Sequence, residues 1–277
     1  MEKILVTTDF SSNSKAGLRF AIQLATQREC HLTFFHSYYI NKPSAWNNTV
    51  FDSFEKSETT KIKKQLDHFV DSVYKSMGVV PADIKCVIKC SFLTDSNIMD
   101  YAAKNNFSFI CISRRGGGKH RKLFGTNTSN LINQSDVPII AVPNTYRRAK
   151  ITSILYTSDL ANLGNEIKKV VDFAESLEAK IELLHFKVPS DTTGNPSLIA
   201  QEIKQFSSYH IKLHLEKVNF AETLIANLEK VIKKSKPSML IMFTQQNRSF
   251  FKRLFLSSIS AEYSFQAKVP LLVFKKV

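Results

Sequence analysis

The sequence predicts an α/β fold in which one unit of parallel βαβ type is written twice. Two observations carry this prediction. The two halves of the chain repeat the same short segments in the same order, and in each half β-rich runs alternate with helical stretches. With 277 residues, of which 43% are hydrophobic and 22% charged, the chain is long and apolar enough for two ordinary domains.

The internal repeat marks both ends of each copy. It predicts one domain over residues 1–146 and a second, shorter in its middle, over residues 150–277. The matching segments are 5–10 with 155–160, 32–36 with 181–185, 122–126 with 253–257, and 137–142 with 269–274.

Five strands are expected in each copy, because runs rich in β-branched and aromatic residues recur at matching places. In the first copy they are 3–8, 31–38, 84–90, 107–113 and 138–142. In the second copy they are 151–157, 180–187, 212–219, 238–244 and 271–275.

Helices fill the gaps between the strands, and the one after each first strand has an apolar face at roughly 3.6-residue spacing. Ser12 or Ser14 can cap the first of these helices. Residues 39–60 lack a clear period until about Phe51, so we expect a surface loop that leads into a helix. The loop holds Trp46, expected to pack against the protein, with contact to a ligand or a neighbouring protomer as the alternative. The two apolar faces consist of Ala16, Leu18, Phe20, Ala21, Leu24 and Ala25, and of Ile167, Val170, Val171, Phe173, Ala174 and Leu177.

Charge and cysteine usage narrow the function classes. A net charge of +14 suits nucleic acid, but the basic residues are spread along helical stretches such as 61–64 and 230–236, without an aromatic RNA-binding strand or a helix-turn-helix pattern. Nucleic acid is therefore not the expected partner. The four cysteines lack Cys-x-x-Cys and zinc-finger spacing, which favours reduced thiols in the cytoplasm. We expect no membrane association, because no apolar stretch approaches about 18 residues and the N-terminus does not resemble a signal peptide.

Residues 113–126 (Ser-Arg-Arg-Gly-Gly-Gly-Lys-His-Arg-Lys-Leu-Phe-Gly-Thr) form the most distinctive local motif, with four glycines and five Lys or Arg. They connect a predicted strand to a helix expected over residues 126–134. Glycines let backbone N–H groups approach an anion, and a helix N-terminus adds unpaired donors and a favourable dipole. The motif predicts a phosphate site, and the alternative is a solvated basic loop without a ligand.

Asp9 follows the first strand, at the same edge of the predicted sheet as the glycine loop. Ligands of open parallel sheets bind outside the carboxyl ends of the strands. If the first and fourth strands are neighbours, Asp9 faces the loop across one crevice and could accept hydrogen bonds from a ribose or a base. The alternative is a turn or N-cap aspartate before Ser11 and Ser12.

These residues resemble the universal stress proteins. The resemblance rests on residues 4–11 (Ile-Leu-Val-Thr-Thr-Asp-Phe-Ser), on the strand end Phe35-His36 and on the loop end Gly125-Thr126, and it covers both halves. It implies two tandem doubly wound five-stranded parallel sheets with strand order 3-2-1-4-5. It also implies that the two halves form an intramolecular pseudo-dimer through edge strands, and a homodimer is a further possibility.

The resemblance also implies a nucleotide site. ATP-binding members carry Gly-x2-Gly-x9-Gly-[Ser/Thr], whereas this chain has Ser113 in place of the first glycine and one residue fewer in the second spacing. A tighter turn through Gly117 and Gly118 could absorb the missing residue. By resemblance, Thr7 and Asp9 lie near adenine or ribose and Ser37 near the base. The residues implied near ribose and phosphates are Ser113, Arg115, Gly116, Gly125, Thr126 and Asn127.

Neither a P-loop in the first copy nor a second nucleotide site is expected. A P-loop needs glycine first and Ser or Thr after the lysine, and Ser113 and His120 hold those places. In the second copy the loop aligned with 113–126 is 244–257, which has no glycine: Asn247 replaces Gly116 and Leu256 replaces Gly125. Because a left-handed conformation costs a non-glycine residue about 1–2 kcal/mol, we expect no nucleotide there by this route.

Catalysis has little support in the sequence. It contains no His-Glu-x-x-His helix, no Gly-x-Ser-x-Gly elbow and no cysteine evidently paired with a base. His36 and His185 recur at matching strand ends, which favours a structural or ligand-edge role over a metal site. The predicted function is binding of ATP or another adenine nucleotide, with or without Mg, as a regulatory ligand of the first domain. The alternatives are a nucleotide-free interaction protein and a slow ATPase.

Overall fold

The computed structural model describes residues 1–44, 47–81, 83–114, 126–187, 196–206, 209–244 and 268–275. Trp46 lies outside these residues. The elements of the first half are β1 (Glu2–Thr7), α1 (Lys15–Ala25), β2 (Cys30–Tyr38), α2 (Asn48–Met77), β3 (Lys85–Cys90), α3 (Thr94–Lys104), β4 (Phe109–Arg114), α4 (Thr126–Gln134) and β5 (Ile139–Pro143). Those of the second half are β6 (Ser153–Thr157), α5 (Leu163–Glu175), β7 (Lys180–Lys187), α6 (Pro196–Lys204), β8 (Ile211–Lys217), α7 (Leu224–Ser235), β9 (Met239–Phe243) and β10 (Leu271–Phe274).

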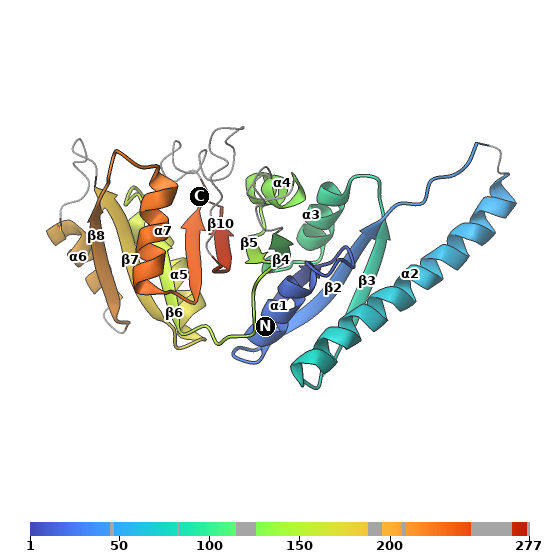
Figure 1. The fold of residues 1–277 in the computed structure, drawn as a ribbon, viewed down its shortest axis with the longest axis horizontal. Coiled ribbons are helices and arrows are strands. Elements are labelled where there is room, and N and C mark those ends of the chain that lie inside the picture. Colours follow the sequence, from blue (N-terminus) through green and yellow to red (C-terminus); the bar gives the residue numbers. More distant parts are fainter. Residues whose placement is uncertain are drawn as a thin grey trace.

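The ten described strands form one sheet with the order β3-β2-β1-β4-β5-β10-β9-β6-β7-β8 (Figure 1). Within each half the pairing is parallel and the order is 3-2-1-4-5, so the predicted fold class is confirmed. The halves meet where β5 and β10 pair antiparallel, with Ile140 opposite Leu272. The expected edge-strand contact therefore joins the two copies inside one chain.

Helices cover both faces of the sheet. Apolar residues of α1, α2, α5 and α6 belong to the core on one face, and those of α3, α4 and α7 belong to the core on the other. Both faces of the central strands are thus covered, which is the doubly wound arrangement. The predicted apolar faces of α1 and α5 are confirmed, since every residue named for them is buried except the half-buried Ala25.

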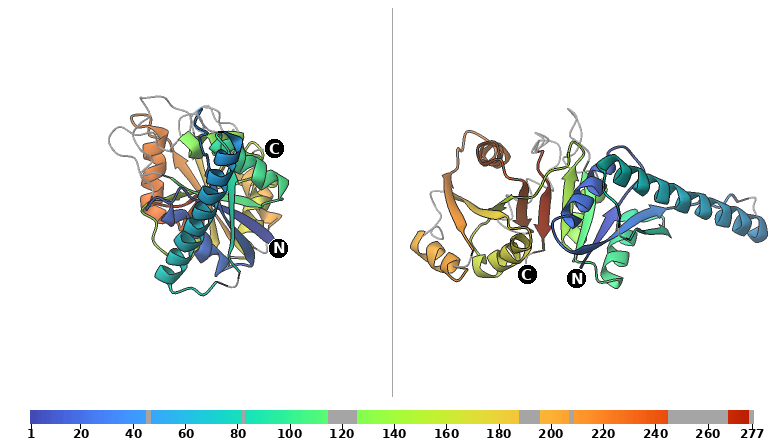
Figure 2. Two further views of the ribbon diagram at one scale, coloured as in Figure 1. Left: turned by 90° about the vertical axis from the view of Figure 1, so that its right-hand side faces the viewer. Right: turned by 90° about the horizontal axis from the view of Figure 1, so that it is seen from below.

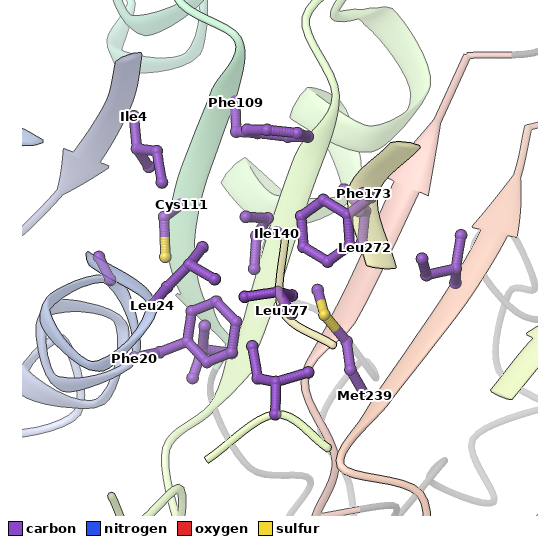
Figure 3. Close-up of a cluster of buried hydrophobic side chains, with 14 of the residues drawn as sticks. Ile4, Phe20, Leu24, Phe109, Cys111, Ile140, Phe173, Leu177, Met239 and Leu272 are labelled. Atoms are coloured by element: carbon purple, nitrogen blue, oxygen red, sulfur yellow. The ribbon is translucent and has the colours of Figure 1, made fainter. Parts of the chain in front are cut away.

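The core continues across the seam between the halves (Figure 3). Phe109 on β4 meets Phe173 of α5 edge to face, with ring centroids 5.6 Å apart, and lies 6.3 Å from the ring of Phe274 on β10. Ile140 and Leu272, paired across the seam, are both fully buried. The two copies therefore share one hydrophobic layer.

Polar contacts from α1 and the residues just after it hold the connection between β5 and β6. Gln27 donates to the Ile151 carbonyl at 3.1 Å and accepts the Ile151 N–H at 2.8 Å. Arg148 donates to the Gln23 side chain at 2.8 Å and to the carbonyl of Met77 at 2.7 Å. Arg28, beside α1, binds Glu2 and lies over the Phe173 ring at 5.0 Å. The end of α1 thus fixes the start of the second half.

Two local expectations need correction. Ser14 does precede α1, but its side chain does not cap the helix. The Ser14 hydroxyl instead donates to the carbonyl of Ser11 at 2.8 Å and lies 2.8 Å from the Thr8 hydroxyl, because the turn before the helix offers closer partners. The helix expected after about Phe51 begins at Asn48 and has 30 residues, whereas its counterpart α6 has 9. The shorter middle of the second copy thus corresponds to this helix.

Candidate functional site

A cavity of about 300 Å³ opens at the carboxyl ends of β1, β2 and β4. It is the place where an open parallel sheet binds its ligands, because the strand order reverses between β1 and β4. Its lining is polar apart from three apolar side chains, Phe35, Ile98 and Ile112. The polar lining residues are Thr7, Thr8, Asp9, Ser11, Asn13, Ser14, Ser37, Thr94, Ser113, Asn127 and Thr128.

The turn between β1 and α1 places Asp9 at this cavity. Phe10 has a φ of +60°, in the left-handed region that bulky residues rarely adopt. A carboxylate oxygen of Asp9 accepts the N–H of Ser11 at 3.0 Å, and the Thr8 hydroxyl accepts the N–H of Phe10 at 3.1 Å. The alternative expectation of a turn aspartate is confirmed by the Ser11 bond, and the carboxylate lines the cavity as well.

Asp9 is held in its ionised form. Partial burial acts to raise the pKa of its carboxyl, but hydrogen bonds from the side chain and backbone of Ser11, with smaller contributions from Ser14, outweigh burial. The pKa of Asp9 therefore lies below its usual value. At neutral pH the cavity contains a carboxylate that accepts hydrogen bonds.

His36 supports the Asp9 turn from behind. Its Nδ1 lies 2.8 Å from the carbonyl oxygen of Thr8, so Nδ1 carries the proton and donates it. The imidazole also packs on Phe10, with ring centroids 4.1 Å apart. Burial lowers the pKa of His36 below its usual value, which favours the neutral ring. These contacts give His36 a structural role.

Ser37 lies at the cavity with a fixed partner that the sequence did not reveal. The amide nitrogen of Asn97, on α3, donates to the Ser37 oxygen at 2.7 Å and to the carbonyl of Lys89 at 3.3 Å. Because a carbonyl only accepts, the bond to Lys89 identifies this atom of Asn97 as the amide nitrogen. The Ser37 oxygen therefore accepts, and its own proton remains available to a further acceptor.

Ser113 fits its position because α1 has a glycine opposite it. The Ser113 oxygen accepts the N–H of Gly17 at 2.6 Å and donates to the carbonyl of Ser14 at 3.0 Å. A Cβ on Gly17 would lie 2.8 Å from that oxygen, closer than packed atoms tolerate. The serine that departs from the glycine of the family motif is thus matched by a glycine on the facing helix, and its hydroxyl is bound to α1.

The structure brings five of the predicted site residues to one cavity. Thr7, 6% exposed, donates weakly to the carbonyl of Cys111 at 3.4 Å. Arg115, Gly116 and Gly125 lie outside the described residues, and Thr126 begins α4 without a described side chain. The five residues at the cavity are Thr7, Asp9, Ser37, Ser113 and Asn127.

Sequence reasoning missed the apolar floor of the cavity and the α3 side of it. Phe35 could have been found, because it lies two residues before Ser37 on one strand and so points to the same face. Thr94, Asn97 and Ile98 had no such signal, since only the tertiary fold brings α3 beside β2. Arg114, one of the five basic residues of the 113–126 motif, is 5% exposed, and burial lowers the pKa of its guanidinium to about 10.

The second half repeats the turn that follows the first strand. Leu160 has a φ of +63° like Phe10, a carboxylate oxygen of Asp159 accepts the N–H of Ala161 at 3.0 Å, and His185 Nδ1 lies 3.0 Å from the carbonyl of Ser158. His185 therefore supports the turn of the second half in the same way as His36 supports that of the first half. No group of three or more His, Cys, Asp or Glu suited to a metal occurs among the described residues, so these histidines form no such cluster.

Strand register corrects the expected alignment of the two copies. Val6 pairs with Cys111 and its counterpart Tyr156 pairs with Ile241, so the residue that occupies the place of Ser113 is Phe243. The expected match of residue 244 with Ser113 is wrong by one position. The sequence alignment was anchored at the far end of the loop, and a one-residue difference in loop length shifted it.

A polar pair accompanies Phe243 in the second half. Tyr156 and Glu166 stand where the first half has Val6 and Ala16, and the Tyr156 hydroxyl donates to Glu166 at 2.5 Å. Glu166 is 2% exposed. The Tyr156 ring meets Phe243 edge to face, with centroids 5.9 Å apart. Large side chains therefore stand at these positions of the second half, where the first half has smaller ones.

Comparisons with known proteins agree with the fold. A model of the universal stress protein family matches residues 1–143, and no curated protein sequence matches the chain. The solved structure of a universal stress protein from Archaeoglobus fulgidus has 16% identity and a TM-score of 0.66, over 99% of this chain and 98% of that chain. A functionally unknown protein from Pseudomonas aeruginosa has 12% identity and a TM-score of 0.58, over 99% and 92%. Because the family model matches more than half of the residues, the chain belongs to the universal stress protein family.

Proposed function

We propose that the first half binds ATP or a related adenine nucleotide as a regulatory ligand. The observation that carries the proposal is the cavity at the carboxyl ends of β1, β2 and β4, which combines an apolar floor with an ionised carboxylate and several hydroxyls. Its volume of about 300 Å³ is at the lower end of the range for small-molecule sites.

The lining suits the three parts of a nucleotide. Phe35, Ile98 and Ile112 offer apolar surface to a purine ring, and Ser37 can donate its proton to a ring nitrogen because Asn97 already occupies its oxygen. Asp9 can accept hydrogen bonds from ribose hydroxyls. The N-terminus of α4 adds backbone donors and a dipole that favours phosphate, with Asn127 in the lining.

The second half is proposed to bind no nucleotide in this way. Phe243 takes the place of Ser113, Ile167 takes the place of Gly17, and both are buried. The second half then contributes its edge strand and its share of the core. A regulatory ligand acts by preferring one conformational state of the protein. Binding to the first half would therefore affect the second half through the β5–β10 pairing and the shared core.

Calorimetric titration with ATP and magnesium tests the proposal. We expect about one site per chain and micromolar affinity, roughly −8 kcal/mol. Gly125→Leu, which installs the second-copy residue, should abolish binding. Asp9→Asn should weaken it, and Asp159→Asn is the matched control because the same change in the equivalent turn should leave affinity unchanged.

The alternatives predict different results in the same experiments. A nucleotide-free interaction protein would show no heat of binding with ATP, ADP or AMP at any magnesium concentration. A slow ATPase would show turnover that Asp9→Ala and Gly125→Leu both remove. Turnover that survives both variants would come from another site or a contaminant.

A further inference from the structure

A second cavity, of about 550 Å³, opens at the amino ends of β1, β2 and β3, at the edge of the sheet that the N-terminus marks (Figure 1; Figure 2, right). We call it the amino-end cavity. Among the described residues it shares no lining residue with the cavity of Asp9, which lies at the opposite ends of the same strands. Its walls include the apolar or aromatic side chains of Tyr74, Val79, Tyr101 and Phe107. Its volume is within the range of small-molecule sites, about 300–1,000 Å³.

Four polar side chains of the amino-end cavity gather on the face of the sheet that α3 covers. Thr33 lies two residues after His31 and two before the buried Phe35, so these three side chains point to one face. Lys3 is the neighbour of His31 in strand register, and Lys85 is the neighbour of Thr33. Neighbours in register point to the same face of a sheet. Two lysines and a histidine therefore surround one hydroxyl.

Thr33 is a buried polar residue that no other part of the described chain satisfies. It is 4% exposed and lines the cavity, and its hydroxyl makes no hydrogen bond with any residue that the structure describes. A buried hydroxyl without a partner is unfavourable. The ammonium group of Lys3 donates to the carbonyl of Asn105 at 3.2 Å, which leaves two of its three N–H donors for another acceptor. The donors around Thr33 thus point to an anion as their ligand.

The second half has a carboxylate at the place of Thr33. Glu182 occupies it, three residues before the histidine that supports the turn, as Thr33 does in the first half. Lys180 precedes Glu182 by two residues on β7, and Lys212 is its neighbour in register on β8. The Nε2 atom of His214 lies 3.2 Å from a carboxylate oxygen of Glu182. The second half thus supplies its own carboxylate to basic surroundings of the kind that the first half also has.

We propose that the amino-end cavity binds a small organic carboxylate with an apolar body. The carboxylate takes the place that Glu182 has in the second half, and it accepts hydrogen bonds from Thr33 and from the ammonium groups of Lys3 and Lys85. The apolar body lies against the aromatic wall, which includes Tyr101. Hydrogen bonds between ionised groups are roughly twice as strong as neutral ones, so an acid should bind more tightly than its neutral amide. The site is independent of nucleotide binding at the other edge of the sheet.

Ligand-observed NMR titration of the full chain with hydrocinnamate tests the proposal, with hydrocinnamide as the neutral counterpart and octanoate as a second acid. Each acid should bind at least about fivefold more tightly than the amide. Thr33→Glu, which installs the residue of the second half, should abolish binding of the acids. Lys3→Gln/Lys85→Gln should weaken it at least about fivefold.

The matched control is Lys180→Gln/Lys212→Gln, which makes the same charge change at the second half and should leave affinity for the acids unchanged. Circular dichroism checks that each variant is folded. Saturating ATP should not displace the acids. No binding of either acid up to about 10 mM overturns the proposal, as do equal affinities for acid and amide or binding that survives Lys3→Gln/Lys85→Gln. Displacement of the acids by ATP would place them in the other cavity and would also overturn it.

Discussion

Gly17 and Ser113 are predicted to be energetically coupled, and the structure gives the size of the effect. In Gly17→Ala the new Cβ would lie 2.8 Å from the Ser113 oxygen and 3.2 Å from the Ser113 backbone nitrogen. Alanine favours the helix by up to about 1 kcal/mol. Overpacking costs about 1–3 kcal/mol, and weakening the Gly17 N–H bond costs about 1 kcal/mol. We expect Gly17→Ala to destabilise the protein by about 1–2 kcal/mol.

The same substitution should behave differently in a Ser113→Gly background. The oxygen is then absent, and only the 3.2 Å contact with the backbone nitrogen opposes the helix preference of alanine. Gly17→Ala should therefore be between neutral and about 1 kcal/mol stabilising. The coupling energy of the cycle should be about 1–3 kcal/mol. Urea unfolding followed by circular dichroism measures all four proteins, and an equal cost of Gly17→Ala in both backgrounds would refute the reasoning.

Three further predictions concern stability. Tyr156→Phe should lower the free energy of unfolding by about 1–3 kcal/mol, because it removes the hydroxyl that donates to the buried Glu166 at 2.5 Å. Tyr156→Val/Glu166→Ala, which installs the pair of the first half, should cost less stability than Glu166→Ala alone, and thermal unfolding measures both. Arg28→Ala should lower the free energy of unfolding by about 2–3 kcal/mol, because the ion pair with Glu2 and the contact with the Phe173 ring are lost. Arg28→Lys should recover less than half of this stability. The pKa of His36 is lowered by folding, so the unfolded chain binds more protons and stability falls as pH drops below about 6.5. The slope between pH 7.5 and 5 should be shallower in His36→Gln, and equal slopes would contradict this assignment.

The repeat and the alternation of β-rich and helical segments were sufficient to predict the sheet. Strand 180–187 was located to the residue and the others to within about two residues, because buried strands have continuous apolar runs bounded by polar residues. Helix α2 was predicted to begin near Phe51, and the structure adds that none of residues 48–65 is buried. The apolar period of a helix indicates which of its faces is apolar, but not which part of the protein packs on that face.

The cavity was predictable in place but not in detail. Asp9 could be placed there because parallel strands deliver their carboxyl ends to one edge, whereas Ser37 was expected there from the resemblance to the universal stress proteins. The contact between Gly17 and Ser113 joins residues 96 positions apart, and that between Asn97 and Ser37 joins residues 60 apart. Neither leaves a local sequence signal. The one-residue error at Phe243 arose because the two loops differ in length, and strand register alone resolves it.

The pairing of β5 with β10 within one chain has a consequence for how the two halves change over time. Two separate subunits would dissociate on dilution, and each would need an intact edge to find its partner. Here the tether keeps the local concentration of one edge near the other constant at any protein concentration. The second half can therefore accumulate changes such as Phe243 and the Tyr156–Glu166 pair while the first half keeps its neighbour.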